Sequence, residues 1–132
     1  MIVAERLTKF YGDHLALDNV SFTIEEGEII GFLGLNGAGK STMLNIFSGF
    51  LQASYGRATI QNFDVKTQAA LIKPLIGYLP DTPPLYDEMS VATYLKFVAR
   101  LKGLNGSKVL EEGLSYAMQK TSLNEVKDVR LF

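Results

Sequence analysis

The sequence contains no cysteine among its 132 residues. A disulfide framework and any Cys-ligated zinc or iron–sulfur site are therefore excluded. No stretch approaches the roughly 20 consecutive apolar residues that a membrane-spanning helix needs. The first residues alternate charged with apolar side chains and do not form a signal peptide. Taken alone, the chain is expected to be soluble.

The sequence also lacks an excess of charge of either sign. Lysine and arginine together number 13, aspartate and glutamate 14, and the formal net charge is −1. This balance argues against a strongly basic nucleic-acid surface, and no nucleic-acid partner is expected. Hydrophobic residues make up 47% of the chain, enough for a core, and the length fits one domain.

Glycine, by contrast, is concentrated in residues 34–42, which read G-L-N-G-A-G-K-S-T. Gly34 to Ser41 fit the phosphate-binding loop pattern G-x-x-x-x-G-K-[ST]. A polyphosphate needs several converging backbone N–H donors, and glycines permit the dihedral angles and close approach that a Cβ would block. Lys40 adds a cation for the β- and γ-phosphates, and the Ser41 hydroxyl is placed to hold Mg²⁺. A nucleotide phosphate site is predicted here, the alternative being a chance glycine-rich turn.

The flanks of this loop fit the strand–loop–helix context that the motif requires. Residues 28–33 are a short apolar run typical of a buried strand, which should lie in a largely parallel sheet. After the loop, Met43, Leu44 and Phe47 recur at helical spacing, and Gly49 is a plausible helix end.

Strands and turns are expected on both sides of this unit. Residues 2–9 suit a strand, and Val20, Phe22 and Ile24 alternate with polar residues. The short polar turn over 25–28, between that strand and the apolar run, predicts an antiparallel hairpin. Later expectations are a short strand over 56–60, a modest helix over 65–73 that Pro74 stops, and a second buried strand over 75–79.

The last third is predicted to be helical. Ser90 can cap a helix that ends at Gly103, and Ser107 can cap another. The inward-facing positions are predicted to be Val91, Tyr94, Leu95, Val98 and Leu101 in the first helix and Val109, Leu110, Leu114, Ala117 and Met118 in the second. The fold class is therefore α/β, mixed in its first two thirds and helical at the end.

Several motifs together resemble the N-terminal part of the ATP-binding domain of ATP-binding cassette (ABC) transporters. Residues 36–42 have the form of the phosphate loop that this family favours, and residues 7–12 resemble the segment whose aromatic residue stacks on adenine. Further similar segments are the second strand (16–22), the turn before the phosphate loop (26–29) and the loop leading to the helical subdomain (76–86).

The resemblance implies a P-loop NTPase core with an N-terminal antiparallel β portion. It places this core portion in residues 1–89 and the start of a helical subdomain in 90–132. The chain is truncated before the family's signature loop, before the Walker B motif with its catalytic glutamate, and before the switch histidine. The chain is accordingly interpreted as a fragment, and Leu85 to Glu88 only mimic the acidic motif.

The resemblance also implies site residues. Tyr11 takes the place of the adenine-stacking aromatic, with Phe10 as the alternative. Asp81 stands where the family usually has glutamine, and some exporter-type members carry an acidic residue at this place. The resemblance implies that Asp81 is a catalytic and metal-contacting residue and that Ser41 is a metal ligand. The implied ATP-binding residues are Tyr11, Gly34, Leu35, Asn36, Gly37, Ala38, Gly39, Lys40, Ser41 and Thr42.

The function implied is that of an ATP-binding subunit coupling ATP binding and hydrolysis to transport, with ATP and Mg²⁺ as cofactors. The full-length protein would be an ATPase, and this chain alone is predicted to be inactive. Expected partners are transmembrane permease subunits and a second nucleotide-binding domain, in a homo- or heterodimer at the cytoplasmic face of the cell membrane.

Three other functional hypotheses stay open. A cassette protein of the translation or DNA-repair kind would share these motifs. A small-molecule kinase or GTPase would share the loop, although residues 124–128 do not fit the Asn-Lys-x-Asp guanine reader that a GTPase needs. A module that only binds nucleotide is the third. His14, the single histidine, is expected to be a solvated loop residue.

Overall fold

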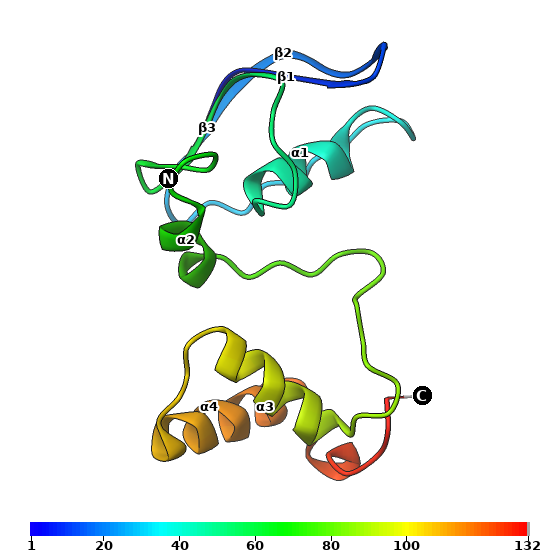
Figure 1. Ribbon diagram of the computed structural model, residues 1–132, viewed down its shortest axis with the longest axis vertical. Coiled ribbons are helices and arrows are strands. Elements are labelled where there is room, and N and C mark those ends of the chain that lie inside the picture. Colours follow the sequence, from blue (N-terminus) through cyan, green and yellow to red (C-terminus); the bar gives the residue numbers. More distant parts are fainter. Residues whose placement is uncertain (132) are drawn as a thin grey trace. The chain divides into compact units, whose positions relative to one another are not determined.

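The computed structural model describes residues 1–131, which form two compact units (Figure 1). The first unit comprises Met1–Tyr78 and the second begins at Leu79. The predicted division between residues 89 and 90 concerns the domains of the family and stays a prediction. No helix among residues 1–131 combines the length and the apolar character that crossing a membrane requires.

The first unit is built on one antiparallel sheet with the strand order β2-β1-β3-β4. Gly12, at φ 57°, helps to turn the chain between the two long strands, and Leu7 and Ala58 are buried on the core side. The strands are β1 (Ile2–Tyr11), β2 (His14–Ile24), β3 (Tyr55–Ile60) and β4 (Phe63–Asp64). The predicted N-terminal antiparallel portion is thereby confirmed, as is the short strand over 56–60.

Helix α1 (Lys40–Phe47) contributes to the core shared with this sheet (Figure 1). Its buried side chains are Met43, Ile46 and Phe47, which join the buried residues of β1, β2 and β3 in one cluster. The helix ends where Gly49 adopts φ 78°, a left-handed conformation suited to glycine. The predicted helix after the glycine-rich loop and its stop are confirmed.

The expected buried strand over 28–33 is wrong. These residues form no strand, and the side chains of Ile29 and Leu33 are 100% and 95% exposed. The hairpin expected across the 25–28 turn is also wrong, because β2 pairs with β1 instead. A parallel strand needs a neighbour in register, and every strand that the structure describes pairs antiparallel within the β2-β1-β3-β4 sheet. Phe32 makes an edge contact with Phe22, with the ring centroids 5.5 Å apart.

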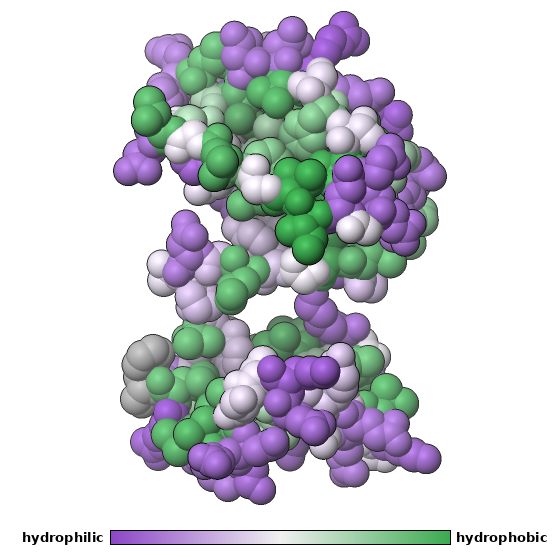
Figure 2. All heavy atoms as spheres, turned by 180° about the vertical axis from the view of Figure 1, so that it is seen from behind, coloured by the Kyte–Doolittle hydropathy of each residue, from purple (hydrophilic) through white to green (hydrophobic). Residues whose placement is uncertain are grey.

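The second expected buried strand, over 75–79, is wrong for the same reason. The chain leaves a short 3₁₀ turn, η1 (Lys73–Leu75), and forms no strand over residues 76–79. Ile76 packs partly buried against the core, whereas Leu79 is 83% exposed. The space-filling view accordingly shows hydrophobic residues on the surface among the hydrophilic ones (Figure 2). The helix expected over 65–73 is reduced to α2 (Ala69–Ile72).

The second unit contains α3 (Val91–Leu101), α4 (Ser107–Lys120) and a 3₁₀ turn, η2 (Asn124–Val126). Ser90 caps α3 as predicted, since its hydroxyl accepts a hydrogen bond from the Thr93 N–H at 3.3 Å. The prediction that Ser107 caps α4 is wrong: the helix already begins at Ser107, and Gly106 is the N-cap residue. Leu110 and Leu114 are buried as predicted, whereas Val109 and Leu101 are exposed, contrary to prediction.

Asp64 organises the turn between β4 and α2. Its Oδ2 lies 2.9 Å from Arg57 Nε, and its Oδ1 accepts from the backbone N–H groups of Lys66 and Thr67. The hydrogen bond from Arg57, with smaller contributions from Thr67 and Lys66, holds the pKa of Asp64 below the usual 3.8. The carboxylate therefore stabilises the folded state fully above about pH 4, and this stabilisation is lost as the pH falls through the depressed folded pKa.

We expect Asp64→Asn to lower stability at neutral pH and to flatten the acid-induced loss of stability below about pH 4. The Arg57 side chain is more than half exposed, so the ion pair itself should contribute less than about 1 kcal/mol. Urea unfolding as a function of pH measures both effects. Asp18→Asn, at an exposed position of β2, is the matched control. An acid dependence unchanged by Asp64→Asn would contradict the assignment.

Candidate phosphate-binding site

The N-terminus of α1 presents free backbone donors. The first intrahelical bond runs from the Met43 N–H to the Gly39 carbonyl at 2.9 Å, so the amides of Lys40, Ser41 and Thr42 have no partner within the helix. No side chain caps this end, and the first turn carries no acidic residue that could occupy it. Such an end favours an anion, because the free N–H groups and the helix dipole both place positive charge there.

Gly39 fixes how this helix end meets the sheet. The residue has φ 86°, and a Cβ at this position would lie 2.5 Å from the Ala16 carbonyl oxygen and 2.6 Å from Leu17 Cδ2. Only a residue without a side chain fits between the loop and β2. Leu17 pairs with Lys9 of β1, so this contact brings the loop beside the final residues of β1.

The Lys40 side chain folds back over the loop. Its ammonium donates to the Gly34 carbonyl at 2.7 Å and to the Leu35 carbonyl at 2.8 Å. An ammonium has three donors, so one remains for an oxygen of a ligand. The Ala38 N–H donates to the Leu35 carbonyl at 3.1 Å and tightens the turn. Cation, turn and helix end therefore belong to one local arrangement.

Most of the other predicted phosphate-loop residues are exposed. Leu35, Asn36, Gly37 and Ala38 are exposed, and Gly37 has φ 85°. Ser41 is exposed and Thr42 is half-buried in the first turn of α1. The structure thus gathers Gly34 to Thr42 into one continuous, accessible loop and helix start.

Tyr11 and Phe10, the two candidate stacking residues, have different surroundings at the end of β1. Tyr11 pairs with His14 across the hairpin and is 47% exposed. The Lys9 ammonium lies over its ring, 5.3 Å from the centroid. Phe10 instead makes an edge contact with Tyr55, with the ring centroids 6.4 Å apart. Tyr11 and the phosphate loop both belong to the first unit.

Asp81, the predicted catalytic and metal-contacting residue, belongs to the second unit, whereas Ser41 belongs to the first. It is exposed, in a bend that follows Pro80. Among residues 1–131 no three His, Cys, Asp or Glu side chains are grouped as a metal cage. Mg²⁺ commonly keeps several waters and binds through one or two protein groups plus substrate phosphates, so a single hydroxyl in the loop suits it.

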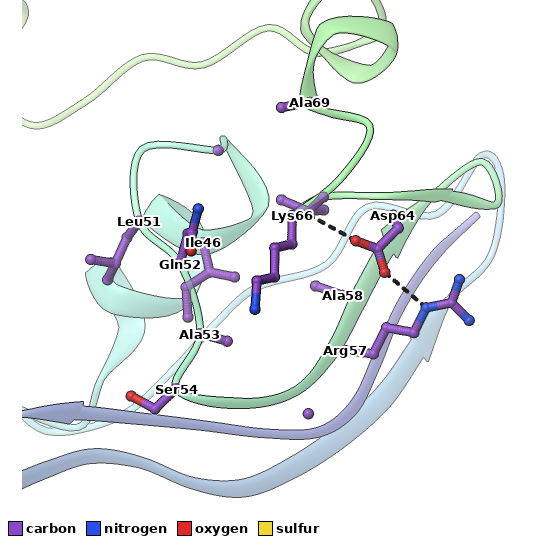
Figure 3. Close-up of a pocket in the computed structure, with 13 residues that line it drawn as sticks. Ile46, Leu51, Gln52, Ala53, Ser54, Arg57, Ala58, Asp64, Lys66 and Ala69 are labelled. Atoms are coloured by element: carbon purple, nitrogen blue, oxygen red, sulfur yellow. Dashed lines mark hydrogen bonds and ion pairs between the residues drawn. The ribbon is translucent and has the colours of Figure 1, made fainter.

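A separate hollow of about 140 Å³ lies between the segment after α1 and the segment around β3 and β4 (Figure 3). Ile46, Ala58 and Val65 contribute apolar lining, and Lys66 extends into it. The Arg57–Asp64 pair lies at its edge (Figure 3). None of the predicted ATP-binding residues lines this hollow.

Comparison with known proteins gives the family. The family model described as "ABC transporter" matches residues 17–131. The chain belongs to the ABC transporter family. The N-terminal resemblance drawn from the sequence motifs is thereby confirmed, and so is the fold class, a partial cassette with an antiparallel β portion and helices.

One relative is the probable multidrug ABC transporter ATP-binding protein YbhF of Escherichia coli, 38% identical over 106 residues, which cover 80% of this chain and 18% of that protein. Among solved structures, an ATP-binding subunit of an ABC transporter has a TM-score of 0.85 and 26% identity, covering 98% of this chain and 53% of that one. The ATP-binding cassette MJ0796, described as a dimer bound to ADP and Pi, has a TM-score of 0.84 at 22% identity, covering 99% and 62%. The last comparison bears on the fold alone.

The chain therefore spans less than two thirds of the length of each of these proteins. It covers only part of a cassette, as the sequence motifs indicated. This explains in physical terms why the side chains of Ile29, Leu33 and Leu79 are exposed: the runs that contain them have the composition of buried strands, and no strand among residues 1–131 pairs with these runs.

Proposed function

We propose that this chain binds ATP with Mg²⁺ through residues 34–42, as part of the ATP-binding subunit of an ABC transporter. The observation that carries the proposal is the joint arrangement of the Lys40 ammonium, the curled loop and the uncapped start of α1. The amides of the helix start and the third donor of Lys40 would hold the β- and γ-phosphates, and the Ser41 hydroxyl would hold Mg²⁺. Tyr11 would stack on the base.

In the whole protein, hydrolysis of Mg²⁺-bound ATP would drive transport. Two cassettes would pair, and transmembrane permease subunits would hold the assembly at the cytoplasmic face of the membrane. Membership of the family supports this role. Asp81 would help to hold the metal or the attacking water.

We expect Lys40→Ala to weaken MgATP binding roughly ten- to a hundredfold, because a hydrogen bond to a charged group contributes about 1.5–3 kcal/mol. Titration calorimetry with ATP and with pyrophosphate measures this, and both ligands should lose affinity alike. Lys66→Met, at the separate hollow, is the control for loss of a positive charge and should leave both affinities unchanged. Equal ATP affinity in the wild-type and Lys40→Ala proteins would refute the phosphate site.

A further inference from the structure

The ring of Tyr11 has a cation on it that the phosphate-binding motif does not require. Lys9 Nζ lies 5.3 Å from the centroid of the ring, within the range of a cation–π interaction. The same ammonium donates to the Gln52 carbonyl at 2.8 Å. Lys9 is half-buried, whereas Tyr11, at the end of β1, is 47% exposed. The Lys9 side chain therefore connects the Tyr11 ring to the carbonyl of Gln52, which lies 43 residues after Lys9.

The carbonyl that holds Lys9 is itself fixed relative to α1. Gln52 lies in the short segment between α1 and β3, and the Leu51 N–H donates to the Asn45 carbonyl of the helix at 3.0 Å. The Ser54 N–H donates to the Thr8 carbonyl of β1 at 2.9 Å. The segment is thus bonded at one end to the helix that carries Lys40 and at the other to the strand that carries Tyr11. These two hydrogen bonds together fix the position of the carbonyl that holds the Lys9 ammonium.

We propose that Lys9 is a positioning residue for the nucleotide base. Its ammonium holds one face of the Tyr11 ring in place and leaves the opposite face for a purine. Because Lys9 is bonded to the segment that follows α1, the ring is held in a fixed relation to the phosphate loop at the start of that helix. The inference rests on the proposed function, in which Tyr11 stacks on the base.

The ring of Phe10 is engaged differently, which favours Tyr11 as the ring that Lys9 serves. Phe10 makes an edge contact with Tyr55 at an interplanar angle of 87°, and its N–H donates to Ser54 Oγ at 3.0 Å. These contacts hold Phe10 against β3 and the segment before it.

The test is a double-mutant cycle on the full chain, with Lys9→Met, Tyr11→Ala and the double variant, titrated with MgATP and with pyrophosphate. Met keeps most of the length of the apolar stem and removes the charge. We expect Lys9→Met to weaken ATP binding about two- to fivefold, the range for an exposed cation–π contact, and to leave pyrophosphate binding unchanged. In the Tyr11→Ala background Lys9→Met should have no further effect, and Lys9→Arg should retain the wild-type affinity.

A measurement without nucleotide tests the contact itself. In the wild-type protein, nuclear Overhauser contacts should join the Lys9 ε-methylene to the Tyr11 ring, and the ring current should shift the methylene protons upfield. Absence of both signals overturns the proposal. So does an equal loss of ATP and pyrophosphate affinity in Lys9→Met, because that is the signature of a general charge effect.

The outcomes separate this inference from the proposed function. If Tyr11→Ala weakens ATP binding and Lys9→Met does not, the role of Lys9 is wrong and the base-stacking role of Tyr11 stands. If Tyr11→Ala leaves ATP affinity unchanged, the stacking assignment and the role of Lys9 are both wrong, whereas the phosphate site stands on Lys40→Ala. If Lys40→Ala has no effect, the proposed phosphate site itself is wrong.

Discussion

The purified 132-residue chain should turn over ATP no faster than about 10⁻³ s⁻¹, the order of an unassisted phosphate-loop protein, whatever its affinity for the nucleotide. Hydrolysis needs a positioned water, a group that orients the water, and positive charge where negative charge develops. Lys40, the loop amides and a Mg²⁺ on Ser41 would supply only the charge.

We expect these residues to lack a firmly held group that orients the water. The candidate for this role, Asp81, is exposed in a bend between Pro80 and Pro83. In the family that the chain belongs to, the catalytic glutamate and the signature loop come from parts of the cassette beyond the motifs found here. We therefore expect that pairing of two copies of these 132 residues does not complete the site.

Phosphate release at saturating MgATP measures this, with Lys40→Ala as the control for a contaminating ATPase. Turnover of about 1 s⁻¹ or more, in the ordinary range of enzymes, that Lys40→Ala abolishes would show that a catalytic base lies within these residues. Turnover that Lys40→Ala leaves unchanged would identify a contaminant.

Gly39→Ala should destabilise the first unit and remove most of its ATP affinity. The new Cβ would lie within 2.6 Å of both Ala16 and Leu17, and the residue would have to keep φ 86°. Because neither the backbone oxygen of Ala16 nor the buried Leu17 side chain can yield easily, the loop must move away from β2. We expect a loss of about 2–4 kcal/mol in the free energy of unfolding and at least a tenfold loss in ATP affinity.

Gly27→Ala is the matched control for this substitution. Gly27 has the same φ of 86°, and a Cβ there would meet no atom within 4 Å. This variant isolates the backbone strain, which should cost about 1–2 kcal/mol at most and leave ATP binding within about twofold of the wild type. Urea unfolding and titration calorimetry on both variants separate the effect of backbone strain from that of close packing against β2. If Gly39→Ala matched Gly27→Ala in both measurements, close packing against β2 would not determine the site.

The local elements around the loop could be predicted from the sequence because their signals are local. The glycine pattern and the spacing of Met43 and Phe47 predict α1, which the structure has at Lys40–Phe47. Ser90 predicts the start of α3 by the same kind of argument, since a hydroxyl at this position caps free amides of the first turn.

Burial of the apolar runs could not be predicted in this way. The composition of residues 28–33 and 75–79 is that of buried strands. Such a run is buried only when a neighbouring strand pairs with it, and the composition of the run does not show whether that neighbour is present. The exposed Ile29 and Leu79 show the result. Where α2 begins was also missed, because Asp64 holds the preceding residues in a turn through hydrogen bonds to Lys66 and Thr67.

The contact between Lys9 and Tyr11 was missed for a third reason. Alternation along a strand places Lys9 and Tyr11 on one face but does not show that their side chains touch, and the register of β1 against β2 shifts between Leu7 and Lys9 and again between Lys9 and Phe10. The side-chain directions at the end of β1 therefore depend on tertiary pairing. The sequence offered Tyr11 as a candidate and gave no basis for choosing the residue that holds it.

The central claim is that residues 34–42 receive the phosphates of ATP, and mapping of amide and aromatic chemical shifts with MgATP tests it most directly. The account predicts that the largest shifts fall on the amides of Gly37 to Thr42 and on the Tyr11 ring, and that pyrophosphate reproduces the loop shifts without those of Tyr11. Shifts concentrated instead around Arg57 and Lys66, at the separate hollow, with the loop amides unmoved, would contradict it.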